Sequence, residues 1–194
     1  SLNLNNATAA TRGNRMEVIG AGALADIAGT FDVGHASMGH SNTLVVSQGG
    51  RLVSGTEMRV GDEGSYNTAT LDSGSSAQSQ QLTVGLDADS IDNLLTITGG
   101  SSWTNSGTVY ISAGGGTGNE ISVDNGTLEA DYIGVGTNGL LSLTSDSGAA
   151  TVNADIAIAQ NGRLEGAGDI VGAVTNAGTI APGASPGQID IDGS

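Results

Sequence analysis

An asparagine followed by alternating apolar residues recurs along this chain at almost constant intervals. The asparagines are Asn42, Asn67, Asn93 and Asn119, which lie 25, 26 and 26 residues apart. A second series runs in phase with them and consists of apolar residues that mostly precede a glycine: Val33, Val60, Val84, Ile111, Val135 and Ile158. Repetition with a period of about 20–50 residues indicates a solenoid or another repeat architecture. The period therefore constrains the fold more than any other feature of the sequence.

Within each repeat, apolar residues alternate with polar ones, and glycine-rich segments separate the alternating runs. Leu44 and Val46, for example, precede a turn at residues 48–50. Alternation with a period of two is typical of strands, and no long window has the apolar spacing of a helix. The 33 glycines, with abundant Ser, Thr, Asn and Asp, suit many short strands joined by tight turns.

We predict an all-β fold, a right-handed parallel β-helix (β-solenoid) of about six to eight coils of 22–27 residues. Successive coils of such a fold hydrogen-bond to each other at a spacing of about 4.8 Å. Equivalent apolar residues then form inward columns, with Leu44 over Leu95 over Ile121. The right hand follows from the rule for parallel crossovers. A β-propeller fits less well because its repeats are about 40–50 residues long.

The sequence predicts a polar N-terminal extension at residues 1–15 and a single solenoid domain at residues 16–192. The extension has no apolar pattern and is interpreted as disordered or as a strand donated to a neighbour. Residues 181–187 form a Pro/Gly loop, and residues 188–194 form a terminal strand. Open ends of a β-solenoid present unpaired strand edges. We therefore expect self-association through the ends.

The charge of the chain excludes several classes of function. Twenty acidic residues face five arginines, which gives a net charge of −15. Nucleic acid binding is disfavoured because the phosphates would remain unneutralised, and an anionic membrane surface would repel the chain. The absence of cysteine excludes disulfides and thiol ligands. No apolar run is long enough for a transmembrane segment. The start at Ser1 suggests a mature or excised piece whose targeting signals lie outside this sequence.

Two segments resemble parts of a known group of proteins. Residues 93–111, which read Asn-Leu-Leu-Thr-Ile-Thr-Gly-Gly-Ser-Ser-Trp-Thr-Asn-Ser-Gly-Thr-Val-Tyr-Ile, resemble the repeats of autotransporter passenger domains and related bacterial surface β-helices. Residues 176–187 are similar to a segment common near the C-terminal part of such passengers. The resemblance covers about residues 30–192. It implies a right-handed β-helix that is extracellular or on a bacterial cell surface and is often adhesive or structural. It transfers no catalytic residue.

The densest group of carboxylates consists of Asp87, Asp89 and Asp92. Such a group could bind Ca²⁺ in a turn or provide the acid and base of glycan hydrolysis. Neither the EF-hand spacing nor the glycine-rich nonapeptide array of calcium-binding β-helices is present. A solvated acidic turn is therefore the simpler interpretation, with Ca²⁺ as the alternative cofactor and no other cofactor expected.

The remaining candidates for chemistry are few. His35 and His40, the only histidines, lie near Asp32, but they would give an incomplete metal-ligand set. We interpret them as surface loop residues. Trp103, the only tryptophan, aligns with core positions, and five aromatic residues in the whole chain are too few for a long sugar-binding groove.

We therefore predict a non-catalytic, structural or adhesive β-solenoid, which serves as a rigid spacer or as the subunit of a cell-surface fibre. One alternative is a β-helix glycan lyase or hydrolase that uses Asp87, Asp89 or Asp92 as acid or base. Another is a passenger fragment that binds a surface glycan or a protein receptor.

Overall fold

The computed structural model describes residues 2–3, 12–35, 37, 39–144, 149–183 and 187–193. Most of the extension predicted at residues 1–15 lies outside the described residues. The same holds for residues 184–186 of the loop predicted at 181–187, and for Ser194 at the end of the predicted terminal strand.

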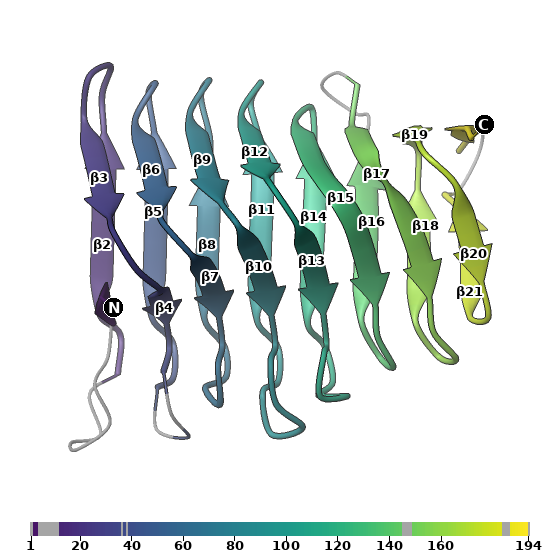
Figure 1. Ribbon diagram of the computed structural model, residues 1–194, viewed down its shortest axis with the longest axis horizontal. Coiled ribbons are helices and arrows are strands. Elements are labelled where there is room, and N and C mark those ends of the chain that lie inside the picture. The colour runs from purple at the N-terminus through teal and green to yellow at the C-terminus, as the bar shows by residue number, and fades with distance from the viewer. Residues whose placement is uncertain are drawn as a thin grey trace.

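The described chain is an all-β solenoid in which flat coils stack side by side along one axis (Figure 1). Every strand pair is parallel, and each strand pairs with its equivalent in the next coil. The prediction of a parallel β-solenoid is thereby confirmed. The right-handed direction of winding stays a prediction.

One sheet contains eight strands, one from each coil, so seven turns of the solenoid connect them. This number agrees with the six to eight coils predicted. The strands, in sheet order, are β2 (Arg15–Ile19), β5 (Thr43–Ser47), β8 (Thr68–Leu71), β11 (Leu94–Thr98), β14 (Glu120–Asp124), β16 (Leu140–Thr144), β18 (Arg163–Gly166) and β21 (Thr179–Pro182).

The second sheet has 14 strands in two rows, which fuse where β15 and β17 each run through both rows. One row contains β1 (Leu2–Asn3), β4 (Phe31–Val33), β7 (Glu57–Val60), β10 (Gln81–Val84), β13 (Thr108–Ile111), β15 (Thr127–Val135), β17 (Thr151–Ile158) and β20 (Val174–Asn176). The other row adds β3 (Leu24–Ile27), β6 (Arg51–Ser54), β9 (Ser76–Ser79), β12 (Ser102–Asn105), β19 (Gly168–Val171) and β22 (Ile189–Asp192).

The two ends of the chain both contribute strands to this sheet. Strand β1, from the N-terminal extension, pairs with β4 of the same chain. Strand β22 lies within the segment predicted as the terminal strand and pairs with β19. Donation of residues 1–15 to a neighbouring molecule stays a prediction.

The inward side chains form the predicted columns. Leu44, Leu95 and Ile121 lie in one column with Ala69 between the first two, and all four are buried. Trp103 occupies a second column and is fully buried, which confirms its assignment to the core. Its indole nitrogen donates a hydrogen bond to Ser79 Oγ at 3.1 Å. Burying the ring therefore leaves no polar atom of the indole unsatisfied.

The asparagines that define the sequence repeat form a buried ladder of hydrogen bonds. The Nδ2 atom of Asn42 donates to Asn67 Oδ1 at 3.0 Å, Asn67 donates to Asn93 at 2.9 Å, and Asn93 donates to Asn119 at 2.9 Å. Each Oδ1 also accepts the backbone N–H of the preceding asparagine. Asn14 extends the ladder through the same bond to Asn42. The ladder thus links five successive coils through amides that are fully buried from Asn42 onward.

The glycines of the second sequence series lie against this ladder. Gly34, Gly61 and Gly85 all have positive φ angles, between 74° and 85°. A Cβ atom on any of them would overlap the amide of the ladder asparagine in the next coil, which for Gly61 is Asn93. The asparagines of the first series therefore pack closely against the glycines that follow the apolar residues of the second series.

The length of the adjoining connections changes where the ladder ends. After Asn119, the equivalent positions are Gly139, Gly162 and Gly178, because these residues precede β16, β18 and β21. The connections beside the ladder, residues 34–42, 61–67, 85–93 and 112–119, are long, whereas residues 136–139, 159–162 and 177–178 are tight turns. We call the first four connections the long-loop edge; it runs along the bottom of Figure 1.

Gly61→Ala should destabilise the fold more than Gly74→Ala. Both glycines have similar φ angles, of 76° and 70°, so both substitutions carry the left-handed strain of about 1–2 kcal/mol. Only at position 61 does the methyl group also meet the buried Asn93 amide, whereas space is open around Gly74. We expect Gly61→Ala to cost at least about 2 kcal/mol more than its control, measured by urea unfolding. Equal costs would contradict the role assigned to the ladder.

Candidate functional site

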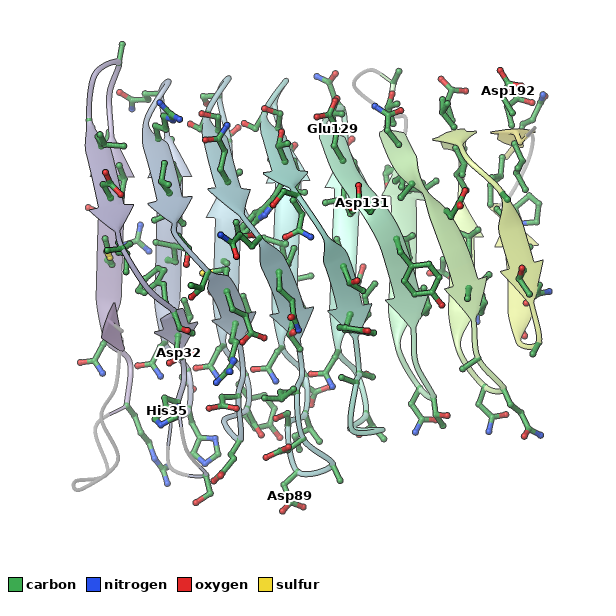
Figure 2. All side chains as sticks on the ribbon, viewed as in Figure 1. Asp32, His35, Asp89, Glu129, Asp131 and Asp192 are labelled. Carbon is green, nitrogen blue, oxygen red and sulfur yellow. The ribbon has the colours of Figure 1, made fainter. Side chains whose placement is uncertain are left out.

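A cluster of charged side chains lies where the outer face of β4 and β7 meets the long-loop edge. Asp32 on β4 and Arg59 on β7 are paired in register, so their side chains project from the same outer face. His35 and Asp62 follow these strands in the adjoining loops. Figure 2 shows Asp32 and His35 at this edge. Strand register therefore brings together residues that are almost one coil apart in the sequence.

The acidic side chains of this cluster surround His35. Its Nδ1 atom lies 2.5 Å from Asp62 Oδ2 and 3.7 Å from Asp32 Oδ2. The Asp32 side chain is 4% exposed and the Asp62 side chain 10%, whereas that of His35 is 35% exposed. The two carboxylates are therefore largely shielded from water, whereas the imidazole of His35 is partly exposed to it.

Arg59 supplies the positive charge of the cluster. Its Nη2 atom lies 2.6 Å from Glu57 Oε2, and its Nη1 atom lies 3.4 Å from Asp62 Oδ2 and 3.8 Å from Asp32 Oδ1. The hydrogen bond to Glu57 raises the pKa of the Arg59 guanidinium, partial burial opposes this rise, and the neighbouring carboxylates add to it. Glu57 is fixed in turn by a 3.1 Å hydrogen bond from Thr83 Oγ1. One guanidinium thus contacts three carboxylates.

Burial raises the pKa of the Asp32 carboxyl group above its ordinary value of 3.8. The charges of Arg59 and His35 act in the opposite direction, and those of Asp62 and Glu57 add to the rise. Desolvation is the largest of these effects, because water cannot solvate a charge in this position. The fold therefore holds a carboxylate in a place that favours its neutral form.

Asp32, His35 and Asp62 could together contact a cation, since their ligand atoms lie within 4.8 Å of one another. Within the described residues they are the one group of three or more potential ligands with this property. Carboxylate oxygen with imidazole nitrogen suits a divalent transition metal better than Ca²⁺, which prefers oxygen alone. Arg59 contacts the same two carboxylates, so its charge competes with a metal for them. The geometry thus favours a cluster compensated by Arg59.

The candidates Asp87, Asp89 and Asp92 do not converge in this way. All three are exposed in the loop at residues 85–93, and they do not form a group with ligand atoms within 4.8 Å. The backbone N–H of Asp87 donates to Ser90 Oγ at 3.3 Å, a contact that shapes the turn. Figure 2 shows Asp89 at the outer end of this loop. Binding of Ca²⁺ by these residues stays a prediction.

His40 and His35 have different environments. His40 Nδ1 accepts a hydrogen bond from the backbone N–H of Ser65 at 3.2 Å, and its ring lies near that of Tyr66. From the sequence, we interpret both histidines as surface loop residues. Both lie in a loop and are partly buried, and only His35 joins Asp32 in the cluster, together with Asp62. The sequence held a signal for this arrangement, because Asp32 and Arg59 directly precede Val33 and Val60 of the repeat.

Comparisons with protein families, curated proteins and solved structures gave no match to this chain. Across the described ranges, no helix is long and apolar enough to cross a membrane.

Asp32→Asn should raise the free energy of unfolding at neutral pH. A carboxyl group whose pKa is raised by folding stabilises the fold below its ordinary pKa, and this contribution is lost as the pH rises through the folded-state value. Urea unfolding of the wild type should therefore show a stability decline above about pH 4 that the variant reduces. The control is Asp89→Asn, an exposed site. A variant that is less stable than the wild type at pH 7 would contradict the argument.

Arg59→Gln should destabilise the fold by about 2 kcal/mol, because it leaves three partly buried carboxylates without their shared cation. Arg51→Gln, which removes an exposed arginine bonded to Gln78, should cost less than about 0.5 kcal/mol. Addition of MnCl₂ or CaCl₂ at about 1 mM should restore part of the stability lost in Arg59→Gln, as measured by thermal unfolding. An equal stabilisation of the wild type by either ion would instead indicate a metal site beside Arg59.

Proposed function

We propose that the chain is a non-catalytic, structural β-solenoid that stacks end to end as the subunit of an extracellular fibre. The observation that carries this proposal is the match between the two ends of the stack. Each end presents parallel strand edges, and the apolar columns of one end are in register with those of the other.

At the N-terminal end, β2 and β3 each have one neighbouring strand among the described residues. A shallow hollow runs between them and is lined by residues 16–19 and 23–25. Met16 and Ala25 are only partly buried there, and Leu24 is 56% exposed. This surface would lose unfavourable apolar exposure if another coil covered it.

At the C-terminal end, β21 and β22 likewise have one neighbour each within the part of the chain that the structure describes. Ile180 on β21 belongs to the column that starts at Met16. Ile191 on β22 belongs to the column that starts at Ala25, and it is 45% exposed. Stacking this end on the N-terminal end of a second copy would place Ile180 on Met16 and Ile191 on Ala25. Both columns would then continue through the junction.

A contact between two different ends is heterologous, and without a closing rotation it propagates as a filament. Backbone hydrogen bonds between the edge strands would supply specificity, as in other cases of strand addition. A stiff rod with two such ends suits a fibre or a spacer. The extracellular location rests on the sequence resemblance to passenger repeats.

The charges at the junction make this assembly dependent on cations. The register that places Ile191 over Ala25 also places Asp192 of one copy over Asp26 of the next. Both aspartates are exposed in the single copy, and like charges directly opposite each other are destabilising. Salt or a divalent cation would relieve the repulsion. Figure 2 shows Asp192 at the end of the stack.

Electron microscopy and light scattering of the purified chain test the proposal. Filaments should appear at high protein concentration, and more readily with CaCl₂ or at high ionic strength. Asp26→Asn combined with Asp192→Asn should form them without added cations. Single molecules at high concentration under all of these conditions would overturn the proposal.

Ile191→Lys should abolish end-to-end assembly, because it places a charge in the apolar column at the junction. Val171→Lys is the matched control. Val171 is similarly exposed, at 52%, but belongs to the outward row of β19. The stability of the single molecule should change by less than about 0.5 kcal/mol in either variant. If Val171→Lys prevented assembly and Ile191→Lys permitted it, the lateral face would be the interface.

A further inference from the structure

A groove of about 420 Å³ lies on the outer face of β13, β15, β17 and β20. Tyr110 and Tyr132 flank it, and Gly134 and Ala157 lie in its floor. None of the residues that line it is charged. The groove is thus unlike the rest of the surface, which carries most of the net charge of −15.

The groove arises where the long-loop edge ends. Leu86 and Ala113, from the last two long loops, form its wall on the N-terminal side. Beyond Asn119 the connections become tight turns, so that four small residues beside this wall are half-buried or exposed, namely Gly134, Gly136, Ala157 and Ala159. The change in loop length therefore creates a step in the surface, and the groove lies on the low side of the step.

The two tyrosines are arranged around a glycine. Tyr110 pairs with Gly134 in register, and Tyr132 lies two residues before Gly134 on the same strand face. A Cβ atom on Gly134 would lie 3.1 Å from Tyr110 Cδ1 and 3.5 Å from Tyr132 Cε1. Both rings nevertheless remain 37% exposed. The glycine thus leaves room for two partly exposed aromatic rings beside the same position on the surface.

The charges around the groove limit what it can bind. Asp155 pairs with Tyr132 in register and is exposed at the margin. An anionic ligand would meet this carboxylate and the negative field of the whole chain. A neutral ligand with a flat apolar face can stack on the rings, because the ring faces carry negative charge and attract weakly positive C–H groups. Gln81 and Thr175 lie in the lining and offer an amide and a hydroxyl for hydrogen bonds.

We propose that this groove binds one or two sugar units of a neutral glycan. A pyranose ring has a C–H face to stack on Tyr110 or Tyr132, and its hydroxyl groups would bond to Gln81 and Thr175. A groove with two rings accommodates a short segment, which agrees with the small number of aromatic residues. The inference is independent of end-to-end assembly, since the groove lies on the side of the rod.

Affinity electrophoresis in gels that contain a soluble β-glucan, a mannan or a soluble chitin derivative tests the proposal. At least one of these neutral polysaccharides should retard the wild type, whereas alginate, which is anionic, should not. Tyr110→Ala and Tyr132→Ala should each weaken binding about tenfold, as expected for the loss of one stacking ring. Tyr66→Ala is the control, because Tyr66 is an exposed tyrosine outside the groove.

Gly134→Ala provides a second variant that does not remove a ring. Its methyl group would enter the space between the tyrosines, so binding should fall while the thermal unfolding temperature changes little. Absence of retardation by all neutral polysaccharides, retention of binding in both tyrosine variants, or a preference for alginate would overturn the proposal. So would loss of self-association in the tyrosine variants, which would make the groove a contact between copies. Light scattering measures filament formation separately, so failure of one proposal does not imply failure of the other.

Discussion

The buried asparagine ladder is the interaction on which the rest of the structure depends. An amide in an apolar interior costs free energy unless both its donors and its acceptor are bonded. In this solenoid the ladder asparagines obtain their partners from asparagines of neighbouring coils and from backbone groups. The bonds form only when successive coils are in one register. The ladder thus selects one register for a stack of apolar residues that would otherwise be favourable but unspecific. A shift by one residue would in addition turn every side chain to the other face.

The ladder also divides the rod into two parts with different surfaces. Where it is present, the connections are the long loops, which supply His35 and Asp62 to the charged cluster. Where glycine replaces asparagine, the connections are tight turns. Both candidate regions depend on this division. The charged cluster includes His35 and Asp62 from the beginnings of two neighbouring long loops, and the tyrosine groove lies where such loops end.

Much of the fold could be predicted from the spacing of residues, because a solenoid converts sequence distance directly into position. The offset between Leu44 and Leu95 gave their common column, and it placed Trp103 in the core. The ladder itself was not predicted, since the repeat identified the asparagines but not the direction of their side chains. The charged cluster was only half predicted, because Asp62 and Arg59 lie in another coil than His35. Alignment on Val33 and Val60 would have paired Asp32 with Arg59 and placed His35 opposite Asp62, because each pair has the same offset from the repeat valines. The spacing does not give the direction in which these side chains point.

The long loops have a geometric consequence of their own. They follow one another at the spacing of the coils, about 4.8 Å, and they leave the scaffold between strands whose register the ladder holds fixed. Groups introduced at corresponding positions of residues 61–67, 85–93 and 112–119 would therefore form a straight row with a repeat set by the backbone rather than by the groups themselves. The long-loop edge could therefore display ligands, dyes or ordered ions at the interval of the coils.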